Sequence, residues 1–143
     1  MFAGRFEHSL DEKNRITLPA RFRNELKNGV VITQGLEACL LVFTREKFQQ
    51  IAEMADAHSL TQEENRLFTL MIFPNAIEDV PDAQGRVRIP DYLLEYAGVK
   101  SEAVIVGMNS RLEIWSPEGW AAKQEYLRQH REKIVPRLAV LGI

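Results

Sequence analysis

The feature that most constrains this fold is that the sequence repeats itself once. The segment LDEKNRITLPA around residue 11 matches PDAQGRVRIPD around residue 82, and its aspartate, arginine and proline each lie 71 positions before their counterparts. Further on, residues 32–48 match residues 104–120 at an offset of 72. This ordered series indicates an internal duplication. Each copy, of roughly 45 residues, is too short to bury much core alone, so we expect the two copies to share one core.

Each copy is expected to fold as a β-hairpin, a short helix and a second β-hairpin. An aspartate opens each first hairpin, and an Asn or a Gly, which adopt positive φ at low cost, precedes the arginine. This spacing predicts a three-residue hairpin loop with a bulge, which leaves Asp and Arg facing each other across the hairpin mouth. A plain turn with a local ion pair is the alternative. The predicted facing pairs are Asp11–Arg15 and Asp82–Arg86.

Prolines and capping residues delimit the predicted helices. Pro19 and Pro90 are expected at the first helical position of the two short helices. Longer helices should follow each copy, one beginning with a capping box at Thr61 and one capped by Ser116. Pro136 is expected to interrupt the helical structure of the segment that follows. The predicted organisation is repeat 1 at residues 5–47, connecting helices at 48–75, repeat 2 at 76–119 and a C-terminal helical segment at 120–143.

Composition excludes several classes of protein. With 18 Lys+Arg against 20 Asp+Glu, nucleic-acid binding must come from a local patch or from several copies acting together. The apolar content of 45% excludes an extended disordered chain. We find no Cys/His metal spacing, P-loop or GxSxG elbow, so no metal, cofactor or enzyme activity is predicted. Without a signal peptide or a membrane-spanning run, the expected location is the cytoplasm.

Several apolar residues allow more than one interpretation. Residues at helical spacing between the copies could line a groove for a partner, but core packing is favoured. Cys39 is expected to be a buried small hydrophobe, and Trp115 and Trp120 are expected to be core anchors. The apolar residues between the copies are Met54, Leu67, Phe68, Met71 and Phe73.

The repeated blocks resemble the MraZ family of bacterial transcriptional regulators. The resemblance rests on MFxGxxxHxLDxKxRxxxPAxFR at the N-terminus, on the second D-x-x-G-R-x-x-I-P block and on GxxxRxEIW at residues 107–115. It implies a mainly β, α+β fold: two AbrB-like halves forming a swapped-hairpin, double-split β-barrel with pseudo-two-fold symmetry. It also implies closed rings of about eight or nine subunits. These regulators bind tandem short repeats upstream of the division and cell-wall operon, which includes their own gene.

The D-x-x-x-R signature and the charge distribution select the candidate DNA contacts. Residues 1–27 carry six basic and four acidic side chains, whereas residues 76–100 carry three basic and five acidic ones, which favours the first copy as the DNA-facing one. Arg15 and Lys13 are expected to reach phosphates and base edges, with Asp11 orienting Arg15. The predicted DNA-binding residues are Arg15, Lys13, Arg5, Arg21, Arg23 and Arg86, and the predicted orienting residues are Asp11, Asp82, Asn14 and Gly85.

The predicted partners are double-stranded DNA carrying tandem direct repeats and further copies of the chain in a ring, at the nucleoid, with no membrane partner. Three other functions stay open: an AbrB-like antitoxin, a ring-forming scaffold that binds protein, and an enzyme. The duplication argues against the antitoxin. The scaffold predicts no salt-dependent affinity for DNA and no effect of Arg15.

Overall fold

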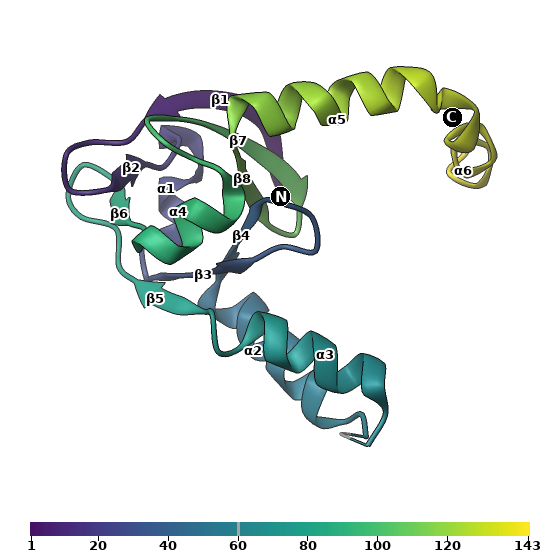
Figure 1. The fold of residues 1–143 in the computed structure, drawn as a ribbon, viewed down its shortest axis with the longest axis horizontal. Coiled ribbons are helices and arrows are strands. Elements are labelled where there is room, and N and C mark those ends of the chain that lie inside the picture. The colour runs from purple at the N-terminus through teal and green to yellow at the C-terminus, as the bar shows by residue number, and fades with distance from the viewer. Residues whose placement is uncertain (60) are drawn as a thin grey trace.

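A computed structural model describes residues 1–59 and 61–143 and has a mixed α+β architecture (Figure 1). Its strands are β1 (Phe2–Ser9), β2 (Arg15–Thr17), β3 (Val30–Gln34), β4 (Leu40–Thr44), β5 (Ile77–Asp79), β6 (Arg86–Arg88), β7 (Glu102–Asn109) and β8 (Leu112–Trp115). Its helices are η1 (Ala20–Phe22), α1 (Arg23–Leu26), α2 (Arg45–Asp56), α3 (Glu63–Ile72), α4 (Asp91–Ala97), α5 (Pro117–Gln129), η2 (Arg131–Lys133) and α6 (Val135–Val140).

The strands form an open antiparallel sheet and a separate ribbon. The sheet has six strands in the order β1-β7-β8-β4-β3-β5, and the ribbon consists of β2 and β6. The closed barrel that the resemblance implies is therefore not formed. In the described residues β2 and β6 pair only with each other, and β5 has three residues, so no strand bridges the two sheet edges.

Strand pairing joins the two repeated segments to each other. β1 precedes the first D-x-x-x-R loop and pairs along its whole length with β7, which follows the second loop. In the same way β5 pairs with β3, and β2 pairs with β6. The expectation that the strands on either side of each loop form a regular hairpin ladder is therefore wrong. The central residues of the ribbon, Ile16 and Val87, are instead both fully buried in the core.

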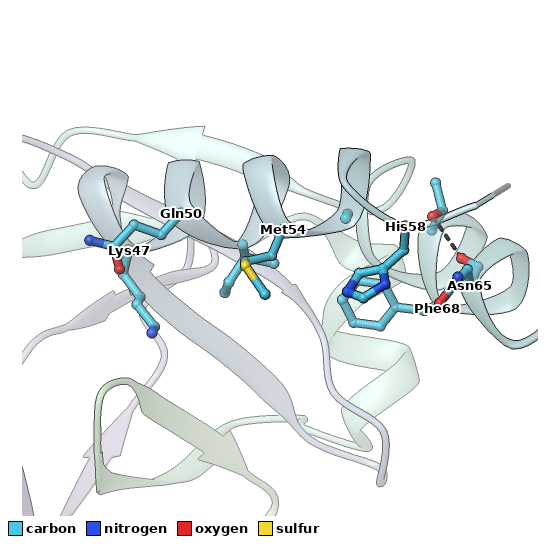
Figure 2. A pocket seen from close by; sticks show the side chains of 9 residues that line it. Lys47, Gln50, Met54, His58, Asn65 and Phe68 are labelled. Carbon is cyan, nitrogen blue, oxygen red and sulfur yellow. Dashed lines mark hydrogen bonds between the residues drawn. The ribbon is translucent and has the colours of Figure 1, made fainter.

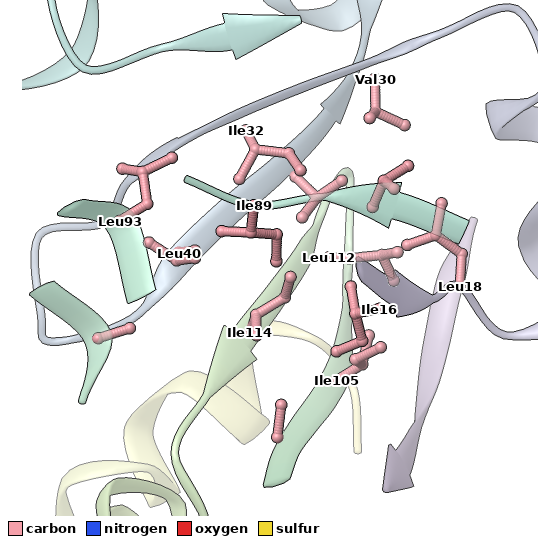
Figure 3. Packing of buried hydrophobic residues seen from close by; sticks show 14 of the residues in the cluster. Ile16, Leu18, Val30, Ile32, Leu40, Ile89, Leu93, Ile105, Leu112 and Ile114 are labelled. Carbon is pink, nitrogen blue, oxygen red and sulfur yellow. The ribbon is translucent and has the colours of Figure 1, made fainter. Parts of the chain in front are cut away.

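Apolar residues from both segments meet in one core (Figure 3). Ile16 and Leu18 of the first segment and Ile89 and Leu93 of the second are fully buried there. The expected shared core is thus present. It also contains Val30, Ile32, Leu40, Ile105, Leu112 and Ile114.

A smaller apolar cluster lies on the other face of the sheet strands β7 and β8. Cys39 and Trp115 are buried in it, and Trp120 packs against it half-buried, with its ring centroid 5.8 Å from that of Trp115. The expectation that Cys39 is a buried small hydrophobe is confirmed. Burial is also the main reason why the pKa of its thiol is raised to about 12. Trp115 is a core residue, whereas Trp120 covers the edge of the cluster.

The prolines do not occupy the helix positions that the sequence predicted. Pro19 and Pro90 occupy the N-cap position with extended ψ angles of 135° and 152°, one residue before the first helical residue. Pro136 does not interrupt a helix. It lies in the first turn of α6, where a residue without an N–H is tolerated.

Of the two side-chain caps predicted for the longer helices, one is formed and the other is not. The Ser116 hydroxyl accepts a hydrogen bond from the Gly119 N–H at 2.9 Å, so the predicted N-cap of α5 is confirmed. The predicted capping box at Thr61 is wrong. Its hydroxyl lies 2.6 Å from that of Ser59, and α3 begins at Glu63 without a side-chain cap.

Two helical projections leave the body of the molecule on different sides (Figure 1). α2 and α3 form a helical hairpin below the sheet, and α5 extends away from it towards η2 and α6. Within residues 1–59 and 61–143, no helix combines the length and apolar character that a bilayer span requires.

Candidate nucleic-acid interface

The first D-x-x-x-R loop is held by the side chain of its aspartate. Oδ1 of Asp11 accepts hydrogen bonds from the backbone N–H groups of Lys13 and Arg15, each at 2.9 Å. Its other carboxylate oxygen accepts one from Nε of Arg15 at 2.7 Å. Asn14 turns the chain with a φ of 57°, as the spacing predicted. The loop therefore fixes the Arg15 side chain through Nε.

The second loop repeats this geometry. Oδ1 of Asp82 accepts from the backbone N–H groups of Gln84 at 3.0 Å and Arg86 at 2.9 Å, and its other oxygen accepts from Nε of Arg86 at 2.7 Å. Gly85 takes the turning position with a φ of 78°. Both predicted Asp–Arg pairs are therefore formed with matching contacts.

Both aspartates are held in their ionised form. The hydrogen bond from the backbone N–H of Arg15 and that residue's guanidinium lower the pKa of the Asp11 carboxyl, and Arg86 does the same for the pKa of Asp82. Each carboxylate thus keeps one arginine in a fixed position. A guanidinium has five N–H donors, so an arginine held through Nε retains donors on its terminal amino groups for a ligand. In Arg86 one of these groups also donates to Oε1 of Gln84 at 3.4 Å.

The ribbon between the loops has one buried and one exposed face. Side chains alternate along a strand, so burial of Ile16 and Val87 places their neighbours on the opposite face. The register pairs Arg15 with Arg88 and Thr17 with Arg86. Three arginines from two distant segments are therefore gathered on one short antiparallel ribbon. We call the set Arg15, Thr17, Arg86 and Arg88 the arginine face.

Two further backbone hydrogen bonds lock the ribbon to the loops. The N–H of Leu18 donates to the carbonyl of Gly85 at 2.8 Å, and the N–H of Ile89 donates to the carbonyl of Asn14 at 2.9 Å. Each loop is thus bonded to the strand end of the other segment. The charge count favours the first segment as the DNA-facing one, but strand pairing merges both segments into one surface.

Sequence reasoning missed Arg88. The sequence pattern that could have indicated this residue is the alternation Arg86-Val87-Arg88. A buried valine separates the two arginines, which must then share the opposite face of the strand. Arg88 is exposed and forms no ion pair in the described parts of the chain, while its backbone N–H donates to the Asp79 carboxylate at 2.9 Å.

The other predicted basic residues are not all on the arginine face. Lys13 is exposed at the tip of the first loop. Arg5 is exposed on β1, and the guanidinium of Arg21 lies 5.6 Å from the ring centroid of Phe22. Lys13 therefore extends the face, whereas Arg5 and Arg21 lie on neighbouring elements.

Arg23 supports the opposite loop. Its Nε donates to the carbonyl of Leu18 at 3.3 Å, and its side chain covers Gly85 so closely that a Cβ there would lie 2.4 Å from Nε. The first loop is supported differently, since Nδ2 of Asn14 donates to the Asp91 carboxylate at 2.6 Å. Arg23 and Asp91 therefore position the two loops, a role that the sequence did not reveal.

The described residues contain no group of three or more His, Cys, Asp or Glu side chains arranged to hold a metal ion. The candidate interface consists instead of fixed cations around a narrow β-ribbon. Such an arrangement can form charge-assisted, bidentate hydrogen bonds with oxyanions and with base edges.

The fold and the site together define a class: an α+β protein in which two similar segments pair with each other and present an arginine-faced ribbon. The sequence comparison agrees with this division. The model of the MraZ protein family, whose description adds "antitoxin-like", matches residues 1–71 and again residues 72–139. The chain belongs to the MraZ family.

Curated relatives match the chain over most of its length. A protein named transcriptional regulator MraZ from Thermomicrobium roseum is 41% identical over 141 residues, which cover 99% of both chains. The protein of that name from Salinispora tropica is 42% identical over 93% of this chain and 92% of its own. That of Roseiflexus castenholzii is 42% identical over 84% of each chain. These relatives are named as regulators of transcription and not as enzymes.

Proposed function

We propose that this chain is a sequence-specific, DNA-binding transcriptional regulator whose arginine face contacts the DNA. The observation that carries the proposal is the strand register, which gathers Arg15, Arg86 and Arg88 on one ribbon. The names of the curated relatives, all regulators of transcription, agree with it.

The arginine face lies on a two-stranded β-ribbon, an element that the major groove of DNA admits. An arginine can pair bidentately with O6 and N7 of guanine, or it can bind phosphate. Asp11 and Asp82 orient the arginines and do not face the DNA, because a carboxylate beside a phosphate is repulsive. Lys13 then reaches a phosphate at the edge of the groove, with Arg5 and Arg21 as outer contacts.

The pairing of β1 with β7, of β5 with β3 and of β2 with β6 supports an AbrB-like, swapped-hairpin arrangement of two halves. In this proposal residues 5–47 and 76–119 form the halves, with pseudo-two-fold symmetry between the two loops. Residues 48–75 and 120–143 supply helices outside the DNA-contact surface.

One arginine face neutralises few phosphates, and the chain as a whole has a net charge of -2. Repetition compensates for this, because several faces on one assembly multiply weak contacts into avidity. We therefore propose a homo-oligomeric ring of about eight or nine subunits at the nucleoid, binding tandem direct repeats. Boxes about 10–10.5 bp apart keep each contact on the same side of the duplex.

The test is fluorescence anisotropy with a duplex carrying tandem repeats from upstream of the protein's own gene, across a salt series. The proposal predicts tight binding to this duplex, weaker binding to a scrambled one and a steep loss of affinity with salt. Equal affinity for both duplexes would overturn the regulator proposal for this operator. A ring-forming scaffold that binds protein would then become the leading function.

A further inference from the structure

An apolar groove between α2 and α3 is left uncovered (Figure 2). It has a volume of about 320 Å³ and contains Met54 and Phe68, which are 63% and 41% exposed. Lys47, His58 and Asn65 contribute its polar rim. The sequence expectation that Met54, Leu67 and Phe68 pack in the core is wrong.

The exposure has a structural cause. α2 has no buried residue and α3 has only Ile72, because the helical hairpin lies outside the sheet and no other described element covers this face. The groove is nevertheless preformed. Phe73 lies between Phe48 and Phe68, with centroid distances of 5.5 and 6.5 Å, and this aromatic contact holds the two helices together.

A second uncovered apolar surface lies at the other extremity of the molecule. Residues 134–143, which we call the C-terminal tail, have the sequence IVPRLAVLGI and carry one charged side chain, Arg137. α6 has no buried residue, and Val140 is 74% exposed. Ile134, Leu138 and Leu141 recur at helical spacing and are all exposed, the pattern with which a helix enters a groove.

The tail and the groove do not cover each other within one chain. α5 carries α6 away from the sheet on one side, and the α2–α3 hairpin projects on the other (Figure 1). Exposed apolar patches of this kind mark interaction sites. Each surface is therefore open to contact with a second molecule.

The two segments that carry these surfaces have opposite net charge. Residues 45–72, which include both groove helices, carry three basic and five acidic side chains. Residues 121–143, which include the tail, carry five basic and two acidic ones. The segment around the groove is therefore net acidic and the segment around the tail net basic. Such a distribution favours contact between unlike ends and opposes tail-to-tail or groove-to-groove contact.

We propose that the C-terminal tail of one copy docks into the α2–α3 groove of a second copy of this chain. Each copy then has one donor end and one acceptor end, so the contact is head-to-tail and can close into a ring. This inference rests on the proposed ring assembly and assigns it an interface. The arginine face lies on neither surface and stays available in every subunit.

The test uses the full chain with an impaired tail or an impaired groove, and measures mass by native mass spectrometry. The tail variant is L138E/L141E and the groove variant is M54E/F68E, and all four side chains are exposed in the single chain. L36E is the matched control, because Leu36 is an exposed leucine in the β3–β4 loop outside both surfaces.

The wild type and L36E are expected to form multimers of the 16.4 kDa chain, and each double variant alone is expected to be a monomer. An equal mixture of the two double variants should give a dimer and nothing larger, because it contains one intact tail and one intact groove per pair. A dimer would support the proposal and would also show that both variants fold. A multimeric tail variant, a mixture that stays monomeric or a monomeric wild type would overturn it.

A second measurement separates this inference from the proposed DNA contact. Binding of the monomeric tail variant to a duplex with a single box is compared with and without R15A. Loss of affinity on R15A supports the DNA contact whatever the masses show. Conversely, a wild-type chain could form the expected multimers and show no binding to DNA. That result would overturn the regulator proposal without contradicting the head-to-tail interface.

Discussion

Arg15 and Arg88 lie directly opposite each other in the antiparallel register of β2 and β6. Like charges in this position destabilise a strand pair by roughly 0.2–1 kcal/mol. Asp11 compensates the charge of Arg15, whereas Arg88 has no ion pair in the described residues. The free protein therefore bears a small electrostatic cost on the arginine face, and a bound polyanion would relieve it.

The first prediction follows from this opposed pair. Arg88→Gln should raise the free energy of unfolding by roughly 0.2–1 kcal/mol, because it removes the repulsion on Arg15. The same change should weaken DNA binding and, if Arg88 contacts a phosphate, lower the log–log salt slope by about 0.9. Urea denaturation and anisotropy measure the two effects. Arg66→Gln, on α3 away from the ribbon, is the control for loss of one positive charge, and equal effects of both variants would contradict the prediction.

The second prediction compares the two matched loops. Arg15→Ala and Arg86→Ala should each weaken binding to the tandem-repeat duplex by roughly 5- to 150-fold, the equivalent of about 1–3 kcal/mol for a bidentate base contact. The factors should be similar, because Asp11 and Asp82 hold the two arginines at the same 2.7 Å distance. A large effect of Arg15→Ala alone would instead show that the first loop makes the DNA contact, as the charge count favours.

The third prediction concerns stability in acid. The pKa values of Asp11 and Asp82 are lowered in the folded protein, chiefly by the backbone N–H groups of Arg15 and Arg86. Their contribution to stability is therefore present above the ordinary value of 3.8 and is lost as the pH falls through the lowered folded pKa. The melting temperature of D11N/D82N should lie below that of the wild type at pH 7 and converge with it in acid.

Glu12→Gln is the matched control for this pH series. Glu12 is an exposed carboxylate in the same loop, so its removal changes the charge without removing the loop hydrogen bonds. Its melting curve should follow the wild type at every pH. A constant difference between D11N/D82N and the wild type across the series would show that the two carboxylates do not supply the acid-sensitive stability.

The fourth prediction concerns the turning position of the second loop. Gly85→Ala should lower the free energy of unfolding by about 1–2 kcal/mol from its left-handed backbone alone, and the contact of the new Cβ with Arg23 adds to this. Asn14→Gly, at the same place in the first loop, should change stability less.

A double-mutant cycle with Arg23→Ala isolates the steric part of this effect by urea denaturation. Gly85→Ala should cost less free energy of unfolding in the Arg23→Ala background than in the wild type. Strict additivity of the two changes would mean that the Arg23 side chain moves aside at no cost, and the positioning role of Arg23 would then be wrong.

Local features of the structure could be read from the sequence with good accuracy. The aspartate, the Asn or Gly, and the arginine of each loop predict the turn and the Asp–Arg contact, because turn geometry depends on residues a few positions apart. The Ser116 cap is local in the same sense. The Thr61 cap is not formed: its hydroxyl lies 2.6 Å from that of Ser59, and α3 begins at Glu63.

The amino-acid sequence by itself determined the duplication, the two loops and the need for one shared core, since repeats, turns and apolar content are properties of the chain. Only the tertiary structure decided that the strands beside the two D-x-x-x-R loops take their partners from the other segment, that Arg88 faces Arg15, and that Met54 and Phe68 line an uncovered groove. The reason is physical. Strand register depends on contacts between residues far apart in the sequence, such as Arg15 and Arg88, and burial depends on which other elements cover a side chain. Local residue preferences specify neither.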